Sequence, residues 1–244
     1  KMLAQQQEAR LMNAITNIDA RLVASAVKNI KRVVKNDLTQ EEELLVVPKS
    51  VKNDAMIELN AVLASFFGVA MYIFGNDVIK SRIKDFGGVG QFSIDEVANK
   101  YIQEISSKTS ESHVETVLSD IFKSIQEASL EGLSITEIEN RVKTKFTEEI
   151  SNARAKTIAR TESNRAFTRA QYEADRQFIG QNGLKGRVYK QWVTRSDNPC
   201  AFCKQLESEG LVLFEKDFRG VGDKIKTTID GEIKEYAVTY EDLE

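Results

Sequence analysis

Proline is almost absent from this chain, and its absence limits the possible folds more than any other feature of the sequence. The 244 residues include only Pro48 and Pro199. A proline within a helix removes a hydrogen bond and its ring clashes with the preceding turn, so segments without proline can run as long helices. The sequence therefore predicts a chain built mainly from long helices, with a connector over residues 35–50.

The first 150 residues are predicted to be almost entirely helical and to form a region that docks on a partner. Residues 3–34 carry apolar side chains at intervals of three and four, which is the pattern of an amphipathic helix with a docking stripe. Residues 61–74, AVLASFFGVAMYIF, include Ser65 as their single polar side chain. Fourteen residues are too few to cross a bilayer, so we expect this segment to be buried on nearly all sides, with no membrane contact.

The later helices are marked by their first residues. Ser93 with Glu96 and Ser134 with Glu137 have the spacing of capping boxes, in which the serine and the glutamate each accept a hydrogen bond from the other's backbone N–H. Residues 153–178 contain neither proline nor glycine and are predicted to form one helix.

The pattern changes in the last quarter of the chain. Residues 186–194 and 211–214 are short runs rich in β-branched, aliphatic and aromatic side chains, which is typical of strands. Asp230 and Gly231 separate two further alternating runs, and this dipeptide favours the tight turn of a β-hairpin.

These patterns predict an α+β fold in two parts: a long helical region over residues 1–150 and a smaller α+β domain over residues 151–244. Charge is divided unevenly along the chain. Residues 151–190 contain nine Lys or Arg against three Asp or Glu, a charge of +6 in a chain whose net charge is −3. A basic segment in an acidic protein indicates either a surface for phosphates or an acidic partner, or a solvated helix face.

Arginine carries most of this positive charge. The candidate DNA-binding residues are Arg160, Arg165, Arg169 and Arg176. Arginine suits bidentate contacts to phosphate better than lysine does, so double-stranded DNA is the expected ligand. Three of the four arginines share one helix face with Glu162, which can pair with Arg165 or Arg169. Such pairing is the competing interpretation, in which an ion-pair network only stabilises the helix.

Cys200 and Cys203 are the only cysteines of the chain and form a C-x-x-C motif. Such a pair is half of a zinc site, a redox dithiol, or two small buried side chains. Pro199 places the pair at the start of a helix, late in a hairpin-rich domain, and this context favours zinc over thioredoxin-like chemistry. A structural zinc takes four ligands, and the one histidine, His113, lies in a predicted surface helix. The remaining ligands are therefore expected outside this chain segment.

Motifs of enzymes are missing from the sequence. It contains no glycine-rich phosphate loop, no H-E-x-x-H and no G-x-S-x-G, so no catalytic residue is assigned and the chain is not expected to be an enzyme. The alternative is an intracellular thiol- or metal-dependent enzyme, or a toxin-like effector, with Cys200 as nucleophile and Glu162 and Arg165 in the site.

Three motifs follow one another over residues 140–218: IARTESNRAF, the W-x-T of YKQWVTRSD, and the D-x-x-C-x-x-C that ends at Cys203. In this order they resemble the C-terminal domain of the Mu F-like phage head morphogenesis family, the minor head proteins of tailed phages. The resemblance implies a structural minor capsid protein of the virion, made in the host cytoplasm and located in the capsid interior or at the portal vertex. Portal and capsid proteins are the implied partners, and contact with packaged DNA stays open. Family members usually carry a later His-Pro-x-Cys-x-Cys segment, which does not occur before Glu244, so the resemblance implies zinc ligands beyond that residue.

Overall fold

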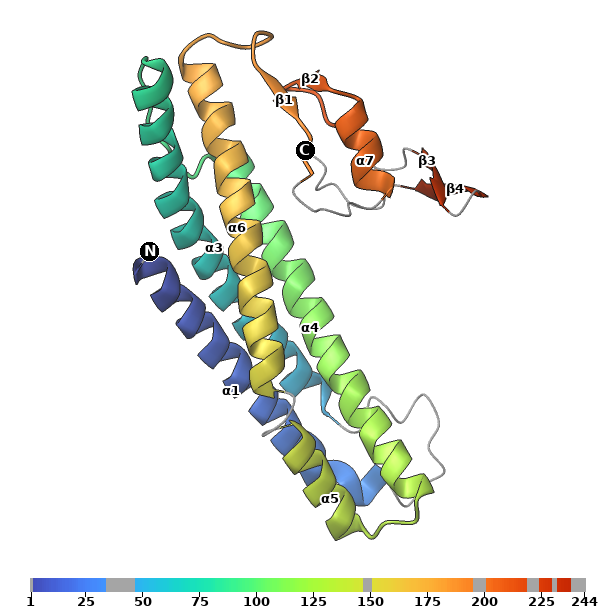
Figure 1. Ribbon diagram of the computed structural model, residues 1–244. Helices are drawn as coiled ribbons and strands as arrows, with labels where there is room; N and C mark the ends of the chain where they lie inside the picture. The colour runs from blue at the N-terminus through green and yellow to red at the C-terminus, as the bar shows by residue number, and fades with distance from the viewer. Residues whose placement is uncertain are drawn as a thin grey trace. The chain divides into compact units, whose positions relative to one another are not determined.

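The computed structural model describes residues 2–33, 47–146, 151–194, 201–218, 224–229 and 232–237 (Figure 1). The chain divides into two compact units. The helical unit comprises Lys1–Val78 and Phe92–Ala174, and the second unit comprises Ile79–Gln91 and Asp175–Glu244. The boundaries between the two units fall after Val78, Gln91 and Ala174.

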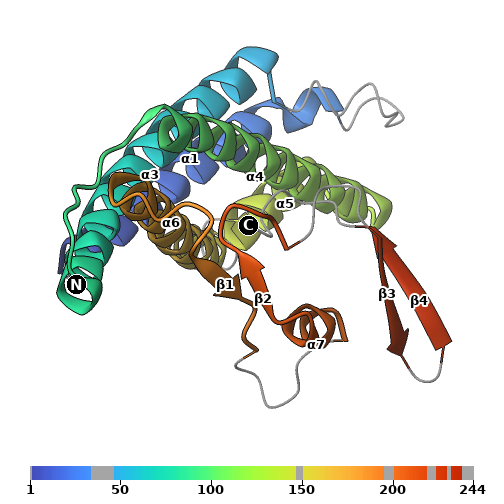
Figure 2. The same ribbon diagram turned by 90° about the horizontal axis from the view of Figure 1, so that it is seen from above.

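Long helices make up the helical unit, as the scarcity of proline predicts. They are α1 (Met2–Val33), α3 (Lys49–Phe86), α4 (Glu96–Leu130), α5 (Ile135–Thr144) and α6 (Ser151–Gln181). Within this unit α1, α3, α4 and α6 lie side by side, and α5 packs on α1 and α4 (Figures 1 and 2). The ends of α3 and α6 continue into the second unit.

The apolar stripe of α1 is buried inside the helical unit. Its fully buried members are Leu11, Ile15, Ile18, Leu22, Ala26 and Ile30. Because α1 contacts α4 and α5 through this stripe, the amphipathic helix predicted over residues 3–34 is confirmed, but the stripe packs on elements of the same chain. The prediction that this stripe needs a partner protein to cover it is therefore wrong.

One face of α3 forms the centre of the core. Phe67 is fully buried, and its ring makes edge-to-face contacts with the rings of Phe66 and Tyr101 at centroid distances of 5.7 and 6.4 Å. Leu63 and Met71, one turn to either side, are also fully buried. This face agrees with the prediction that residues 61–74 are buried against the other helices.

The opposite face of α3 is open to solvent. Ile57, Val69 and Tyr72 are 69%, 37% and 54% exposed. The prediction of burial on nearly all sides is wrong here, because the helical unit covers only one side of this apolar helix. By length and composition α3 could also cross a membrane, and 33% of its most apolar stretch is buried within the protein. Core helices of soluble proteins meet the same criterion, so this property alone assigns no membrane role.

The two predicted helix starts have different outcomes. At α5, Ser134 and Glu137 form the predicted capping box, with the Glu137 side chain accepting from the Ser134 backbone N–H at 2.7 Å. At α4, the N-cap is Asp95, whose carboxylate accepts from the backbone N–H of Ala98 at 3.0 Å. The capping box predicted from Ser93 is therefore wrong, because Asp95 directly precedes the first helical residue and supplies the acceptor itself.

The second unit contains short elements after α6. They are β1 (Tyr189–Gln191), α7 (Ala201–Ser208), β2 (Leu211–Leu213), β3 (Lys224–Ile229) and β4 (Glu232–Ala237). β1 pairs with β2 and β3 pairs with β4, both antiparallel. The register of the second pair sets Ile229 opposite Glu232, which agrees with the predicted hairpin, while Asp230 and Gly231 lie outside the described residues. The chain is thus mostly helical with a small α+β part, as the predicted fold class requires.

Two side-chain amides at the end of α6 hold the loop that follows α3 in the second unit. Asn182 donates to the backbone carbonyl of Val89 at 2.7 Å and accepts from its N–H at 3.0 Å. Gln181 makes the same reciprocal pair with the backbone of Gln91. Gly88 has a φ of 89°, and a Cβ there would come within 2.3 Å of the Asn182 oxygen, so the position requires glycine.

Candidate functional site

The helix α6 carries the predicted DNA-binding arginines, and an alanine-rich stripe fixes which way they face. Ala155, Ala159, Ala166 and Ala170 are fully buried, so this side of α6 packs closely on the bundle. At about 100° per residue, Arg160 lies about 140° around the helix from Arg165. Arg160 is exposed, whereas Arg165 and Arg169 flank the buried stripe and are partly buried.

Arg165 neutralises a buried carboxylate. Its Nη1 donates to both carboxylate oxygens of Glu162 at 2.8 Å, and the Glu162 side chain is only 5% exposed. Of the two arginine partners that the sequence predicted for Glu162, Arg165 is bonded to it in the structure. A third of the Arg165 side chain, 33%, stays accessible to solvent.

Arg169 has more side-chain partners than Arg165 and is less exposed. Its Nη2 lies 2.8 Å from Oε1 of Glu173, whose side chain is completely buried. The guanidinium carbon also lies 4.4 Å from the ring centroid of Tyr101 and 5.0 Å from that of Tyr172. Only 15% of the Arg169 side chain is exposed, so it acts as the counterion of Glu173 and has little surface left for a phosphate.

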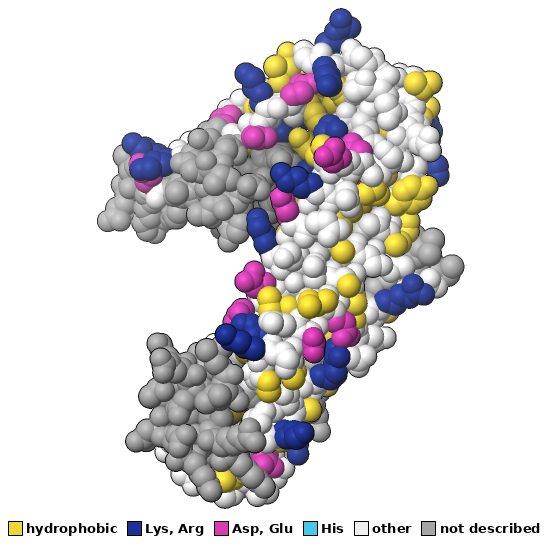
Figure 3. Space-filling view, turned by 180° about the vertical axis from the view of Figure 1, so that it is seen from behind, with side chains coloured by type: hydrophobic (Ala, Val, Ile, Leu, Met, Phe, Trp, Pro, Cys, Tyr) yellow, Lys and Arg dark blue, Asp and Glu magenta, His cyan; other side chains and the backbone are white. Residues whose placement is uncertain are grey.

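The four predicted DNA-binding arginines therefore differ in how much of their surface is accessible. Arg160 is exposed on the helical unit, Arg165 keeps part of its surface accessible, Arg169 is occupied, and Arg176 is a half-buried residue of the second unit. Over the described part of the face drawn in Figure 3, Lys and Arg side chains lie scattered among Asp and Glu. Sequence reasoning missed the role of Arg169, although Glu173, one turn further on, was the available signal.

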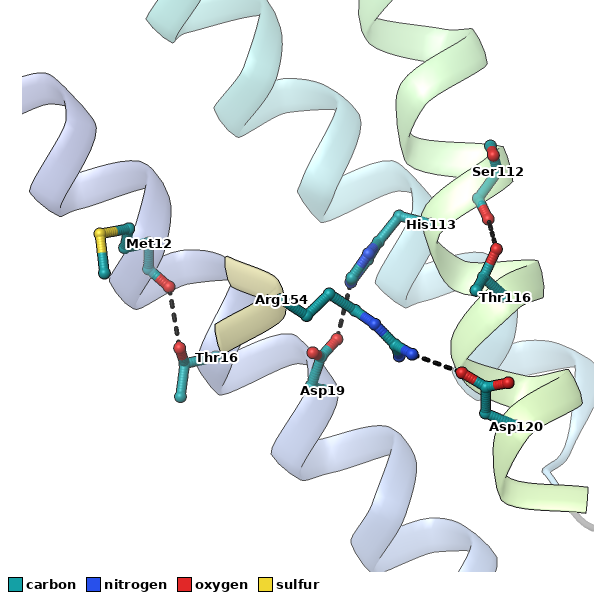
Figure 4. Close-up of polar contacts among 8 residues, drawn as sticks. All are labelled: Met12, Thr16, Asp19, Ser112, His113, Thr116, Asp120 and Arg154. Carbon is teal, nitrogen blue, oxygen red and sulfur yellow. Dashed lines mark hydrogen bonds and ion pairs between the residues drawn. The ribbon is translucent and has the colours of Figure 1, made fainter. Parts of the chain in front are cut away.

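A polar cluster that sequence reasoning also missed lies between α1, α4 and α6 (Figure 4). His113 Nε2 is 2.7 Å from Asp19 Oδ1, and both side chains are at most 5% exposed. Arg154 of α6 donates to Asp120 of α4 beside them, as Figure 4 shows. His113 was predicted on a surface helix, and this is wrong: it is a core residue that joins α4 to α1.

The cysteine motif belongs to the second unit. α7 begins at Ala201, so the predicted helix start after Pro199 agrees with the structure, while Cys200 lies outside the described residues. Cys203 is half-buried near the start of this helix.

A carboxylate of α7 fixes the W-x-T segment that precedes the cysteines. Glu207 accepts from the hydroxyl of Thr194 at 2.6 Å and from its backbone N–H at 3.2 Å. These two bonds, the side-chain bond first, hold the pKa of Glu207 below its ordinary value. Trp192 packs edge-to-face on the buried Phe218 at a centroid distance of 5.7 Å. The W-x-T segment and the helix of the C-x-x-C motif are thus joined in one small packed unit.

The described residues alone do not complete a metal site. In that part of the chain, no three His, Cys, Asp or Glu side chains lie together in a way that could hold a metal ion. The single histidine is bonded to Asp19 in the helical unit. Zinc at Cys200 and Cys203 therefore stays a prediction that requires ligands from elsewhere.

Comparison with known proteins adds no relative. No family model matches the chain, and neither a curated protein nor a solved structure matches it at a significant level.

Proposed function

We propose that this chain is a structural minor head protein of a tailed phage, associated with the portal vertex and acting in head morphogenesis. The observation that carries the proposal is the order of the I-A-R-T-E, W-x-T and D-x-x-C-x-x-C motifs, which resembles the Mu F-like family. Local packing supports it, because Thr194 of the second motif bonds to Glu207 of the helix that holds Cys203. The Thr194 side chain of the W-x-T motif thus serves to build the second unit, as a structural protein requires.

Portal and capsid proteins are the partners that follow from this proposal. We expect the full chain, tagged and mixed with the portal protein of the same phage, to co-purify with it. We also expect mass spectrometry of purified virions to find the protein, and immunogold labelling to place it at one vertex. Virions that lack the protein would contradict the proposal.

Double-stranded DNA is a second proposed partner, and Arg160, Arg165 and Arg176, which keep part of their surface accessible, are its proposed contacts. Each arginine that neutralises a phosphate releases counterions, so Arg160→Gln and Arg165→Gln should each reduce the slope of log affinity against log salt by about 1. Arg169→Gln should leave this slope unchanged. Arg169→Gln should lower the free energy of unfolding by about 3 kcal/mol, and Arg165→Gln by less because Arg165 is more exposed, since each removes the basic partner of a buried carboxylate.

The matched control for the DNA experiment is Lys108→Gln, which removes an exposed positive charge from α4. Fluorescence anisotropy with one duplex at several salt concentrations would compare all four variants with the parent. Equal slopes for the parent, Arg160→Gln and Arg165→Gln would reject DNA and favour an acidic protein partner.

Zinc at Cys200 and Cys203 is the proposed cofactor, with the other ligands supplied from outside this segment. Elemental analysis of the longest natural form of the protein should find about one zinc per chain, and Cys203→Ser should lose it. A metal-free protein whose thiols react rapidly with iodoacetamide would reject the zinc site and favour the thiol-dependent enzyme instead. In that alternative Glu162 and Arg165 belong to the site, and in the structure they are paired with each other, with Glu162 buried.

A further inference from the structure

The open face of α3 is the largest feature of the helical unit that the proposed function leaves unexplained. Ile57, Ala61, Ser65, Gly68 and Tyr72 follow one another at steps of four, four, three and four, so they lie on one side of the helix. All are exposed except Gly68, which is half-buried. A Cβ added at Gly68 would meet no atom within 4 Å, so the surface above it is unfilled.

This face carries no charge. No Asp, Glu, Lys or Arg occurs between Glu58 and Asp77, and from Ile57 to Tyr72 the face extends about 24 Å along the helix. Glu58 lies at the N-terminal edge of this face. It forms an ion pair with Arg21 at 2.5 Å, which neutralises its charge within the chain. A partner for this face must therefore be uncharged over the same length, since burying an unmatched charge against it would be unfavourable.

The described solvent faces of the neighbouring helices do not have this property. Lys108 and Glu111 are exposed on α4, and Lys156 and Arg160 on α6. Among the described faces of α3, α4 and α6, the uncharged surface that a second copy offers is thus the same face of α3.

The sizes of the side chains also suit a second copy. Two large residues, Ile57 and Tyr72, stand at the ends of the face, and three small ones, Ala61, Ser65 and Gly68, lie between them. If two copies cross antiparallel about a twofold axis midway between Ser65 and Gly68, Tyr72 of each helix meets Ala61 of the other. Ser65 then meets Gly68, and Ile57 lies opposite Asn76, beyond the end of the face. Tyr72 thus fills the space above Ala61, and the small residues at the crossing let the helix axes approach to about 8 Å.

From this complementarity we infer that α3 mediates a symmetric homodimer, in which the face of Ile57, Ala61, Ser65, Gly68 and Tyr72 packs antiparallel on the same face of a second copy. A twofold contact of this kind uses one patch twice and closes on itself, so it forms dimers and not open chains. The inference is independent of the proposed phage function.

Light scattering during size-exclusion chromatography tests the dimer directly. The parent should have twice the 27.5 kDa chain mass at micromolar concentration. Ser65→Glu sets two negative charges near the axis and should weaken the dimer by about 100-fold, giving monomers. Ser107→Glu, at an exposed serine of α4, is the matched control and should stay dimeric. Circular dichroism should show equal helix content for all three proteins.

Cross-linking tests the antiparallel register. An equimolar mixture of the single variants Ser65→Cys and Gly68→Cys should form a disulfide-linked heterodimer on mild oxidation that a reductant reverses, whereas either single variant alone, with the same native cysteines, should not cross-link. A parent that is monomeric at 100 µM, or a dimer that survives Ser65→Glu, overturns the inference. A monomer that floats with neutral phosphatidylcholine vesicles would overturn it in favour of a lipid surface.

Discussion

The helical unit and the second unit use polar side chains in opposite ways. In the helical unit the carboxylates of Asp19, Glu162 and Glu173 are buried, and each is paired with a basic side chain. In the second unit, Glu207 and Glu215 are exposed or half-buried and accept from backbone N–H groups of turns and strand ends.

The difference depends on which backbone N–H and C=O groups of each unit lack a hydrogen-bond partner within their own helix or strand. A long helix bonds its own N–H groups along nearly its whole length, so a carboxylate inside a bundle finds no free backbone donor and takes a basic side chain as its partner. Short strands and turns leave many backbone groups without an internal partner, and side-chain oxygens then supply the missing acceptors. Polar substitutions should therefore be costly in the helical unit and mild in the second unit.

The largest expected effect is at the centre of the bundle. Phe67→Asp places a carboxylate at a fully buried position and should lower the free energy of unfolding of the helical unit by about 4 kcal/mol or more. Val97→Asp, at a 48% exposed position in the first turn of α4, is the matched control and should change little. Far-UV circular dichroism during thermal unfolding would measure both. Equal melting curves for Phe67→Asp and the parent would show that the bundle core is not where the structure places it.

The next effect concerns Asp19 and His113. Replacing either residue alone by leucine removes a hydrogen-bonded partner from a buried polar side chain, which should cost about 3 kcal/mol. The double replacement removes both polar groups and should recover much of that loss. Denaturant unfolding of the four proteins in a double-mutant cycle gives the coupling energy. Additive losses would mean that the two side chains do not act as a pair.

A smaller effect is expected at the main ion pair of the second unit. Arg82 Nε and Nη2 donate to the two oxygens of Asp175 at 2.6 and 3.0 Å, and the side chains are 30% and 19% exposed. Asp175, first by hydrogen bonding, raises the pKa of Arg82 above its ordinary value, so the guanidinium stays charged. Arg82→Gln should cost about 1 kcal/mol, because water screens a half-exposed pair. A loss as large as that of His113→Leu would remove the contrast between the units.

The helices of both units could be predicted from the sequence because their signals are local. The absence of proline and glycine over residues 153–178 predicted a helix that the structure extends to Ser151–Gln181. The Ser134 capping box and the Asp-Gly hairpin depend on residues within a few positions of each other, and both agree with the described structure.

The contacts that sequence reasoning missed are between distant residues or between faces of one helix. His113 meets Asp19 from 94 residues away, and a lone histidine gives no indication of such a partner. The segment from Ala61 to Phe74 is apolar on all sides, so its pattern cannot distinguish the face that packs on Tyr101 from the face that stays open. The choice is made by the neighbouring helices, which cover only one side of α3.

The smallest expected effect is at Glu207, where the second unit uses a carboxylate to hold a strand end. The carboxylate form is favoured in the folded unit, because the Thr194 side chain first and its backbone N–H second lower the pKa below the ordinary 4.5. This contribution to stability is therefore present above about pH 4.5 and is lost as the pH falls through the lowered pKa. Thr194→Val removes the hydroxyl donor and keeps the backbone N–H, so the pKa of Glu207 should rise part of the way towards 4.5.

Carbon-13 NMR of the Glu207 carboxyl through an acid titration measures the shift, with Ser208→Ala on α7 as the control. Identical midpoints in the parent and Thr194→Val would show that the strand end is not held by this carboxylate.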